Sequence, residues 1–409
     1  MIYNKCMAYL FSTVALIFLC VACGKSSSDY PDARNNPTST LMLDLPGVGI
    51  ATDKIDLSQL PELKGEHAVI SRGDSQWHYR LHSYLVYFDN QYWCMWSHGP
   101  IVEDKPTQHI RFSTSKDGLE WSEAKILVGS SDQAGFRHIS RGFWLRGDGK
   151  LRALASHDEA LKDGRTHFFG ESLDLRSYIW NSRNASWEFE GIVFDDTINN
   201  FPPKKLATGD WMMTRRTSAR TISFLVGGQD SISDWEVIPY SIKDREDGLK
   251  PEEPFWYTLQ DGNLVALARD NSRSGRLMRS FSIDNGKTWT APVLTNFPDA
   301  TSKFNVLRVS KGFYVMINNA NPAQRNPLCL SVSFDGLVYT ALNRLPIPDS
   351  IEGVDWEEGS SHDTANYESF QYPHVIEHEG DLLVTYSRKK QAIEVVKVSL
   401  SEVERLLEN

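Results

Sequence analysis

Short apolar runs and short polar turns alternate along this chain in a unit that recurs six times. In each unit an apolar run is followed by a turn of two or three polar or glycine residues and then by a second apolar run. Such a unit predicts a β-hairpin, because turns of this length and composition connect antiparallel strands. Turns spaced by roughly 50 to 70 residues leave room for four strands each, so six hairpins predict an all-β propeller of six blades. The predicted turns are Asp89-Asn90, Gly147-Asp148-Gly149, Thr208-Gly209-Asp210, Asp261-Gly262, Lys311-Gly312 and Glu379-Gly380.

A second repeat follows the first five turns at a nearly constant offset. Its fullest copy, at 282–289, has the pattern Ser-x-Asp-x-Gly-x-Thr-Trp, and residues 115–121 and 333–339 are shorter copies. Residues 172–174 and 231–235 keep only parts of it. In such a segment the aspartate caps the backbone of a tight turn, the glycine supplies a positive φ, and the aromatic ring packs between strands. We therefore assign the repeat a structural role and expect its aspartates in equivalent outer turns.

The first residues of the chain form a different pattern. An apolar run at 7–21 is too short for a comfortable membrane span and predicts a secretory signal. Residues 19–24 resemble a bacterial lipobox, in which the cysteine, here Cys23, becomes lipidated and N-terminal after cleavage. We therefore expect a protein of the cell envelope, in the outer membrane and facing the periplasm or the outside, that touches the membrane only through this lipid. The expected segments are a signal peptide at 1–22, a flexible tether at 23–40 and one propeller domain at 41–409.

Composition and charge narrow the set of partners. The 409 residues carry a formal net charge of −10, which argues against nucleic acid and gives no long-range attraction for an acidic ligand. Any anionic substrate must then be held by local cationic groups. Cys94 and Cys329, which follow the predicted cleavage site, lie in apolar runs and are expected to be buried thiols and not metal ligands. We expect a monomer that uses no metal and no cofactor.

The turn repeat and several single residues together resemble the sialidase family of glycoside hydrolases, over nearly all of residues 75–400. The pattern at 282–289 is the Asp box found in sialidases, and Tyr79-Arg80-Leu81-His82 stands where that family has a Phe-Arg-Ile-Pro signature. His82 in place of the proline is a departure from the family. The resemblance implies a six-bladed β-propeller of the sialidase type. It also implies an exo-acting, retaining glycoside hydrolase that removes a terminal acidic sugar, similar to sialic acid, from a glycan substrate.

The resemblance implies a clamp of three arginines for the substrate carboxylate: Arg80, Arg269 and Arg325. Guanidinium groups suit this role because they bind a carboxylate through two parallel, charge-assisted hydrogen bonds. The hairpin spacing gives separate support, since Arg80, Glu253 and Tyr372 lie nine, eight and seven residues before their own turns. Such similar offsets should bring them to one rim of the central channel. Arg269, seven residues after its turn, returns to the same rim.

The resemblance also implies the catalytic roles. Tyr372 matches the nucleophilic tyrosine, and Glu253 matches the glutamate that accepts its proton. Asp104, in the loop after the first hairpin, matches the acid/base aspartate. The residue types leave two alternatives open, because Glu103 is adjacent to Asp104 and Glu252 is adjacent to Glu253.

Two other functions fit the same sequence. A propeller enzyme acting on uronic acid glycans, as a glycosidase or a lyase, could use His82 or His98 with Tyr372; a lyase would remove the proton next to an arginine-neutralised carboxylate. Its product would be an unsaturated uronate that absorbs ultraviolet light. A non-catalytic glycan-binding lipoprotein is the other alternative, although binding alone does not require an acid, a base and a tyrosine together.

Overall fold

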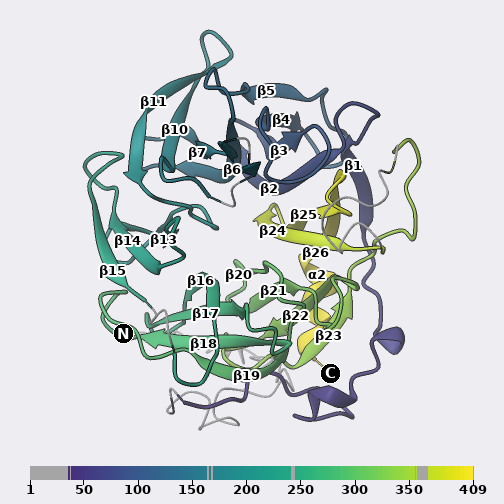
Figure 1. Cartoon of the computed structure of the whole chain (residues 1–409). Coiled ribbons are helices and arrows are strands. Elements are labelled where there is room, and N and C mark those ends of the chain that lie inside the picture. Colours follow the sequence, from purple (N-terminus) through teal and green to yellow (C-terminus); the bar gives the residue numbers. More distant parts are fainter. Residues whose placement is uncertain are drawn as a thin grey trace, which may run out of the picture.

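The computed structural model describes residues 36, 38–163, 165–166, 169–240, 245–354, 356 and 367–408. The predicted signal peptide, Cys23 and most of the predicted tether lie outside the described residues. Six four-stranded antiparallel sheets stand around a central axis (Figure 1). The prediction of an all-β protein with six propeller blades is therefore confirmed.

The first five blades each consist of four strands whose order in the sheet follows the chain. The first strands of blades 1, 2, 4, 5 and 6 contact those of their neighbours around the axis, so the first strands are the inner strands. Each predicted hairpin turn joins the first two strands of its blade. Blades 1 to 5 are β2 (Tyr79–Phe88), β3 (Gln91–Gly99), β4 (His109–Ser115) and β5 (Lys125–Val128); β6 (Phe136–Leu145), β7 (Leu151–Glu159), β10 (Asp174–Asn181) and β11 (Ser186–Asp195); β12 (Lys204–Lys205), β13 (Trp211–Arg216), β14 (Ile222–Gly227) and β15 (Trp235–Pro239); β16 (Pro251–Thr258), β17 (Leu264–Asp270), β18 (Arg276–Ser282) and β19 (Val293–Pro298); and β20 (Asn305–Arg308), β21 (Tyr314–Asn318), β22 (Cys329–Ser333) and β23 (Ala341–Arg344).

The sixth blade joins the two ends of the described chain. Its first three strands, from the axis outwards, are β24 (Phe370–His378), β25 (Asp381–Arg388) and β26 (Ala392–Ser399), and its outermost strand is β1 (Glu66–Arg72) from the N-terminal side. β1 pairs antiparallel with β26. This pairing closes the ring of blades with backbone hydrogen bonds between segments more than 300 residues apart in sequence.

The three clear copies of the Asp box occupy equivalent turns, between the third and fourth strands of blades 1, 4 and 5. Asp117 accepts hydrogen bonds from two successive backbone N–H groups at 2.9 and 2.8 Å. Asp335 makes the same pair of contacts, and Asp284 accepts from the backbone N–H of Thr288 at 2.9 Å. The predicted structural role of these aspartates is confirmed.

Of the two weaker copies, the structure supports one. Residues 231–235 form the third turn of blade 3, and the indole N–H of Trp235 donates to the carbonyl of Ile232, as the box tryptophans do. The copy at 172–174 is not an Asp box, because Asp174 begins β10 at the opposite end of the blade and pairs with Arg176. That prediction was wrong because a Ser-x-Asp pair without the glycine and the aromatic residue does not specify the turn.

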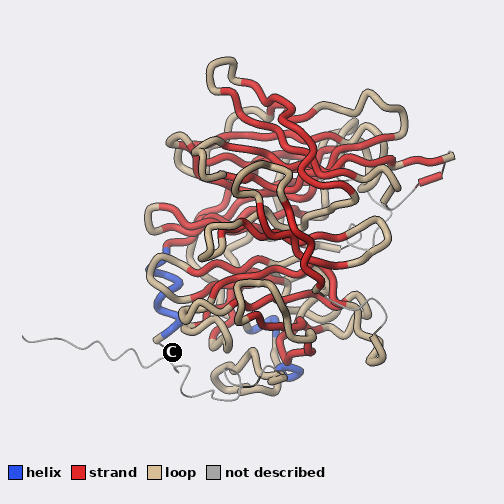
Figure 2. Tube along the Cα trace, turned by 90° about the vertical axis from the view of Figure 1, so that its left-hand side faces the viewer, coloured by secondary structure: helices blue, strands red, loops and turns tan. Residues whose placement is uncertain are grey.

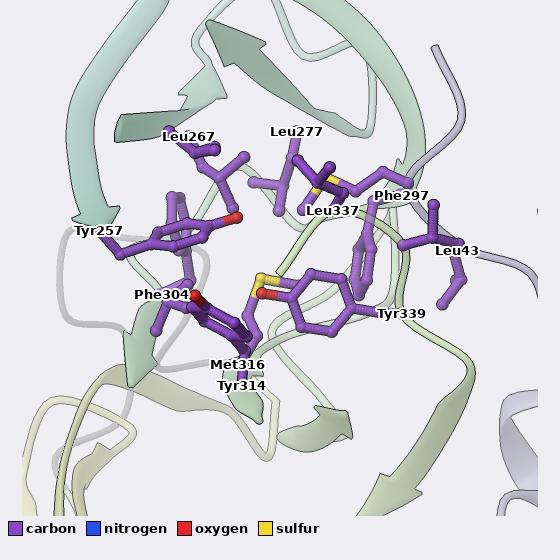
Figure 3. Packing of buried hydrophobic residues seen from close by; sticks show 14 of the residues in the cluster. Leu43, Tyr257, Leu267, Leu277, Phe297, Phe304, Tyr314, Met316, Leu337 and Tyr339 are labelled. Carbon is purple, nitrogen blue, oxygen red and sulfur yellow. The ribbon is translucent and has the colours of Figure 1, made fainter. Parts of the chain in front are cut away.

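Apolar side chains fill the space between neighbouring blades. Figure 3 shows the cluster between blades 4 and 5, where Tyr257 and Tyr314 pack with Phe304. Leu43, from the segment that precedes β1, packs into the same cluster, and its backbone N–H donates to Asn296 Oδ1 at 3.0 Å. The N-terminal segment is thus attached to blades 4 and 5 before it reaches blade 6.

Helical segments are short and lie at the periphery (Figure 2). No helix in the described part of the chain has the length and apolar character needed to cross a bilayer. One additional small hairpin extends the loop between β7 and β10. These elements are η2 (Thr52–Lys54), η3 (Leu57–Gln59), α2 (Leu400–Glu404) and η5 (Arg405–Leu407), with the hairpin strands β8 (Leu161–Lys162) and β9 (Arg165–Thr166).

Candidate active site

A cavity of about 590 Å³ opens at the centre of the propeller, where the inner hairpins have their open ends. This volume lies in the usual range for small-molecule sites. Eight Arg and Lys side chains and four Asp and Glu side chains line it, eight minus four giving four excess positive charges. The whole chain, in contrast, has a net charge of −10. The cavity is therefore a local cationic site in an acidic protein and is suited to an anionic ligand.

Three residues of the cavity wall lie in equivalent β-bulges, one in each of three inner strands. His82 in β2, Glu253 in β16 and Tyr372 in β24 have left-handed φ angles of 55°, 50° and 53°. Each falls within a register shift near the open end of its hairpin. Such a bulge turns a side chain out of the regular alternation, and here all three line the cavity. Arg141 stands at the equivalent bulge of β6 and lines the cavity as well.

Arg80, which we expected at this level, points elsewhere. It precedes the bulge by two residues, and its Nε donates to Ser71 Oγ at 2.8 Å while Nη1 donates to the carbonyl of Trp77. Asp74 lies 3.8 Å from its Nη2. His82 takes the cavity position expected for Arg80. A proline, fixed near a φ of about −65°, could not adopt the φ of His82, so the departure from the family signature also changes the backbone.

Arg269 and Arg325 meet at one backbone carbonyl. Nη1 of Arg269 and Nη2 of Arg325 both donate to the carbonyl oxygen of Thr301, each at 3.2 Å. Arg325 also donates to Gln371 Oε1 at 2.9 Å, and its guanidinium carbon lies 5.5 Å from the centre of the Tyr372 ring. Two of the three predicted carboxylate-binding arginines therefore lie side by side next to Tyr372.

Glu253 and Glu252 face different arginines. Glu253 Oε2 lies 3.1 Å from Arg269 Nε, whereas Glu252 Oε2 lies 2.9 Å from Arg216 Nε. Burial opposes the charge of Arg269, but Glu253 and Tyr372 beside it raise the pKa of its guanidinium above the usual value. Arg269 therefore links Glu253 to Tyr372. This arrangement distinguishes Glu253 from its neighbour Glu252.

Asp104 lies in the loop between β3 and β4 and is held by a buried arginine. Its Oδ1 is 2.5 Å from Arg137 Nη1, and Arg137 also binds Asp158 through Nε at 2.9 Å and Nη2 at 3.0 Å. Burial raises the pKa of Asp104 to about 7, although Arg137 acts in the opposite direction. A carboxyl group with this pKa holds its proton at mildly acidic pH, as a general acid must.

Glu103, the neighbour of Asp104, belongs to a different set of contacts. Its carboxylate forms an ion pair with Lys390 and lies 3.6 Å from His82 Nε2. The His82 ring is 5.4 Å from the Tyr372 ring, centre to centre. Burial keeps the pKa of His82 well below its usual value, so the imidazole is neutral. His82 is therefore a neutral group beside Tyr372.

His98, the other histidine considered from the sequence, is not in the cavity wall. It pairs across β2 and β3 with Arg80, and its ring stacks on Trp77 at 5.2 Å and lies 4.9 Å from His109. Burial lowers the pKa of His98 to about 2. Of the two histidines, the structure brings only His82 to Tyr372.

Sequence analysis missed two buried cations, Arg141 in the cavity wall and Lys303 beside Tyr372. Arg141 lies six residues before the second hairpin turn, close to the offset of seven that His82 and Tyr372 have, so the spacing could have identified it. Lys303 donates to Tyr84 Oη at 2.6 Å, and its Nζ lies 5.7 Å from the centre of the Tyr372 ring. Burial lowers the pKa of Lys303 to about 7. No pattern in the sequence around Lys303 indicates this position.

Comparison with known proteins agrees with the architecture. The model of the family described as BNR repeat-like domain matches residues 90–384. The chain therefore belongs to this family. No curated protein sequence matches the chain.

Several solved sialidase structures share the fold. A sialidase superposes with a TM-score of 0.59 at 20% identity; the match covers 84% of this chain and 34% of the sialidase, so this chain spans about a third of that protein. Trypanosoma rangeli sialidase in complex with sialic acid gives a TM-score of 0.60 at 13% identity, with 85% and 61% covered. A leech intramolecular trans-sialidase complexed with 2,7-anhydro-Neu5Ac gives 0.58 at 13%, with 83% and 70% covered. At these identities the likeness establishes a sialidase-type propeller fold.

Proposed function

We propose that this protein is an exo-acting, retaining glycoside hydrolase that removes a terminal acidic sugar of the sialic acid kind from glycans. The observation that carries the proposal is the pair of arginines, Arg269 and Arg325, side by side against Tyr372. A sialic acid bears its carboxylate on the anomeric carbon. Arginines that hold this carboxylate through bidentate hydrogen bonds would therefore also fix the reacting carbon beside the tyrosine.

In the proposed reaction Tyr372 attacks the anomeric carbon and forms a covalent glycosyl-enzyme. A tyrosine suits this step because a carboxylate nucleophile would be repelled by the carboxylate of the substrate. The phenol needs a base, since its ordinary pKa is about 10, and Glu253 accepts the proton while Arg269 stabilises the negative charge that develops on the oxygen. Asp104 protonates the leaving oxygen. It then takes a proton from the water that releases the sugar, which gives retention.

The direct test is incubation of the protein with an aryl α-sialoside. We expect release of the phenol together with free sialic acid, whose first-formed anomer has the configuration of the substrate by NMR. Binding of the glycoside without any release would favour a non-catalytic glycan-binding protein. Absence of both binding and release would contradict the proposal.

A lyase or glycosidase for uronic acid glycans is a second candidate because of His82. The residue at the first bulge is a neutral imidazole 5.4 Å from the Tyr372 ring, where the proposed hydrolase would be expected to have an arginine. In a lyase His82 would remove the proton next to the carboxylate. Loss of activity in His82→Ala, together with a product that absorbs ultraviolet light, would support this candidate over the hydrolase.

The pH dependence of turnover tests the role of Asp104. Burial raises its pKa from 3.8 to about 7, so the group is protonated at pH 6 and loses its proton as the pH rises through 7. We expect kcat to fall about tenfold for each pH unit above this point, because only the protonated form can act as the acid. Asp104→Asn should remove this alkaline limb and most of the turnover, and Glu103→Gln is the matched control. If Glu103→Gln, and not Asp104→Asn, removes the limb, the acid is Glu103.

We also propose that Cys23 carries a lipid anchor and that the protein resides in the cell envelope. The lipobox-like sequence and the polar segment that follows support this proposal. Cys23→Ser should move the protein from the membrane fraction to the soluble fraction of the producing cells. A variant that stays with the membranes would refute the anchor.

A further inference from the structure

One side of the cavity carries more positive charge than a single carboxylate requires. Four cationic side chains, which we call the basic rim, line the cavity on blades 3 and 4: Arg216, Arg220, Lys250 and Arg273. They are separate from the arginine pair that adjoins Tyr372. The proposed cleavage of one acidic sugar does not use them.

Two arginines of the basic rim, Arg220 and Arg273, lie in turns at equivalent positions of neighbouring blades. Arg220 lies between β13 and β14, and its backbone N–H donates to the carbonyl of Thr217 at 2.9 Å. Arg273 lies between β17 and β18, and its N–H donates to the carbonyl of Asp270 at 3.0 Å. Their φ angles are 64° and 65°, a left-handed conformation that is unfavourable for a bulky side chain. The fold therefore presents an arginine twice in the same costly turn geometry at the cavity rim.

Asp270 fixes the base of the rim on blade 4. Its buried carboxylate accepts from the backbone N–H of Lys250 at 2.8 Å and from that of Ser272 at 3.0 Å. Its carbonyl oxygen is the one that accepts from Arg273. Lys250 and Arg273 therefore project from one well-ordered loop base, although both side chains are exposed.

The acidic side chains that line the cavity pair with cations other than Lys250 and Arg273. Glu252 pairs with Arg216, while Glu103, Asp104 and Glu253 pair with cations outside the rim. Within the described residues, neither Lys250 nor Arg273 forms an ion pair. The rim thus attracts an anion, and the proposed substrate carboxylate is already held elsewhere.

The half-buried ring of Phe169 lies between the arginine that pairs with Asp104, the proposed acid, and an arginine of the basic rim. The guanidinium carbon of Arg137, which pairs with Asp104, lies 5.9 Å from the centre of the Phe169 ring. The guanidinium carbon of Arg216 lies 5.1 Å from the same ring. Phe169 lines the cavity and offers an apolar surface of the kind that lines ligand sites. A leaving sugar that receives its proton from Asp104 would extend over Phe169 towards the basic rim.

We propose that the basic rim binds a second anionic group, a carboxylate or a sulfate, on the sugar at the leaving side of the cleaved bond. The inference rests on the proposed hydrolase function and narrows its substrate class to oligosaccharides that bear two acidic groups on neighbouring sugars. Charge-assisted hydrogen bonds to exposed arginine and lysine provide the recognition.

The test compares the double variant Arg220→Gln/Arg273→Gln with the wild type. The probes are 3′-sialyllactose, which has one anionic group, an α2,8-linked sialic acid dimer with two carboxylates, and a 3′-sialyllactose with a sulfate on its galactose. Dissociation constants are measured by calorimetry in the Tyr372→Phe background, so that no probe is consumed. We expect the preference for doubly charged over singly charged probes to fall about tenfold in the double variant. The dimer and the sulfated probe separate a carboxylate from a sulfate as the second group.

Arg183→Gln/Arg276→Gln is the matched control, because it removes the same charge from sites outside the cavity wall. It should keep the wild-type preference. An unchanged preference in the rim variant, or an equal loss for all three probes, would overturn the inference. If the wild type cleaves none of the probes, the proposed hydrolase function fails, but the binding preference still decides whether the rim holds a second anion.

Discussion

Tyr372→Phe should lower kcat by at least about a thousandfold, which corresponds to roughly 4 kcal/mol of transition-state stabilisation, while substrate affinity changes little. The substitution removes the proposed nucleophilic oxygen and leaves the ring in place. The ring keeps its neighbours His82 and Arg325, and phenylalanine tolerates the left-handed φ as well as tyrosine does. The arginines proposed to bind the substrate carboxylate are therefore preserved. The measurements are kcat with an aryl α-sialoside and the dissociation constant of sialic acid.

Tyr257→Phe is the control for this experiment. It also removes one buried tyrosine hydroxyl, which donates to the carbonyl of Gly336 at 2.7 Å in the cluster between blades 4 and 5. Loss of that hydrogen bond should cost about 1 kcal/mol of folding free energy and leave kcat unchanged. Near-normal turnover in Tyr372→Phe would exclude the covalent mechanism. If His82→Ala is then inactive, the base is His82 and the lyase candidate takes precedence.

Replacing Arg269 or Arg325 should cause the second largest loss of activity. Arg269→Gln or Arg325→Gln removes one of the two guanidinium groups at Thr301. We expect a loss of about 2 to 4 kcal/mol of transition-state stabilisation, so kcat/KM should fall roughly thirty- to a thousandfold. Arg269→Gln should be the more severe of the two, because Arg269 also faces Glu253 and Tyr372. Lysine at either position should recover only part of the loss, since it keeps the charge but not the planar fork.

Arg80→Gln tests whether Arg80 binds the substrate carboxylate, as the sequence resemblance implies, or has a structural role, as its position outside the cavity wall indicates. The Arg80 side chain is buried against Ser71 and Trp77 and does not line the cavity, so the variant should lose folding stability and keep kcat/KM for the folded fraction. Thermal unfolding and kinetics measured on the same preparations separate the two effects. If Arg80→Gln impairs kcat/KM as much as Arg269→Gln does, Arg80 belongs to the carboxylate site and the cavity must rearrange on binding.

The cationic excess of the cavity would allow this acidic protein to bind the proposed acidic ligand. A net charge of −10 repels anions at long range, so recognition depends on groups that act within a few ångströms. Buried or half-buried arginines meet this need because their charge persists at any physiological pH and because their burial from water strengthens their hydrogen bonds. Increasing salt should therefore weaken binding at the exposed basic rim more than at the buried pair.

The sequence alone determined the architecture. Six hairpin turns and the Asp boxes are local signals, because a tight turn needs particular residues at particular positions whatever surrounds it. The spacing from the hairpin turns also predicted that Glu253, Arg269 and Tyr372 lie at the same end of the central channel, and in the structure all three line the cavity. At Asp174, where the local signal lacked both the glycine and the aromatic residue, the prediction was wrong.

Only the tertiary structure decided which way the side chains point and what they pair with. Arg80 and His82 differ by two positions, and the bulge that turns His82 into the cavity and leaves Arg80 outside depends on a left-handed φ that the apolar pattern does not encode. The pairing of Asp104 with Arg137 joins two blades, and β1 completes blade 6 from the opposite end of the chain. Such contacts arise from closure of the ring, since residues far apart in sequence meet only after all six blades have taken their places.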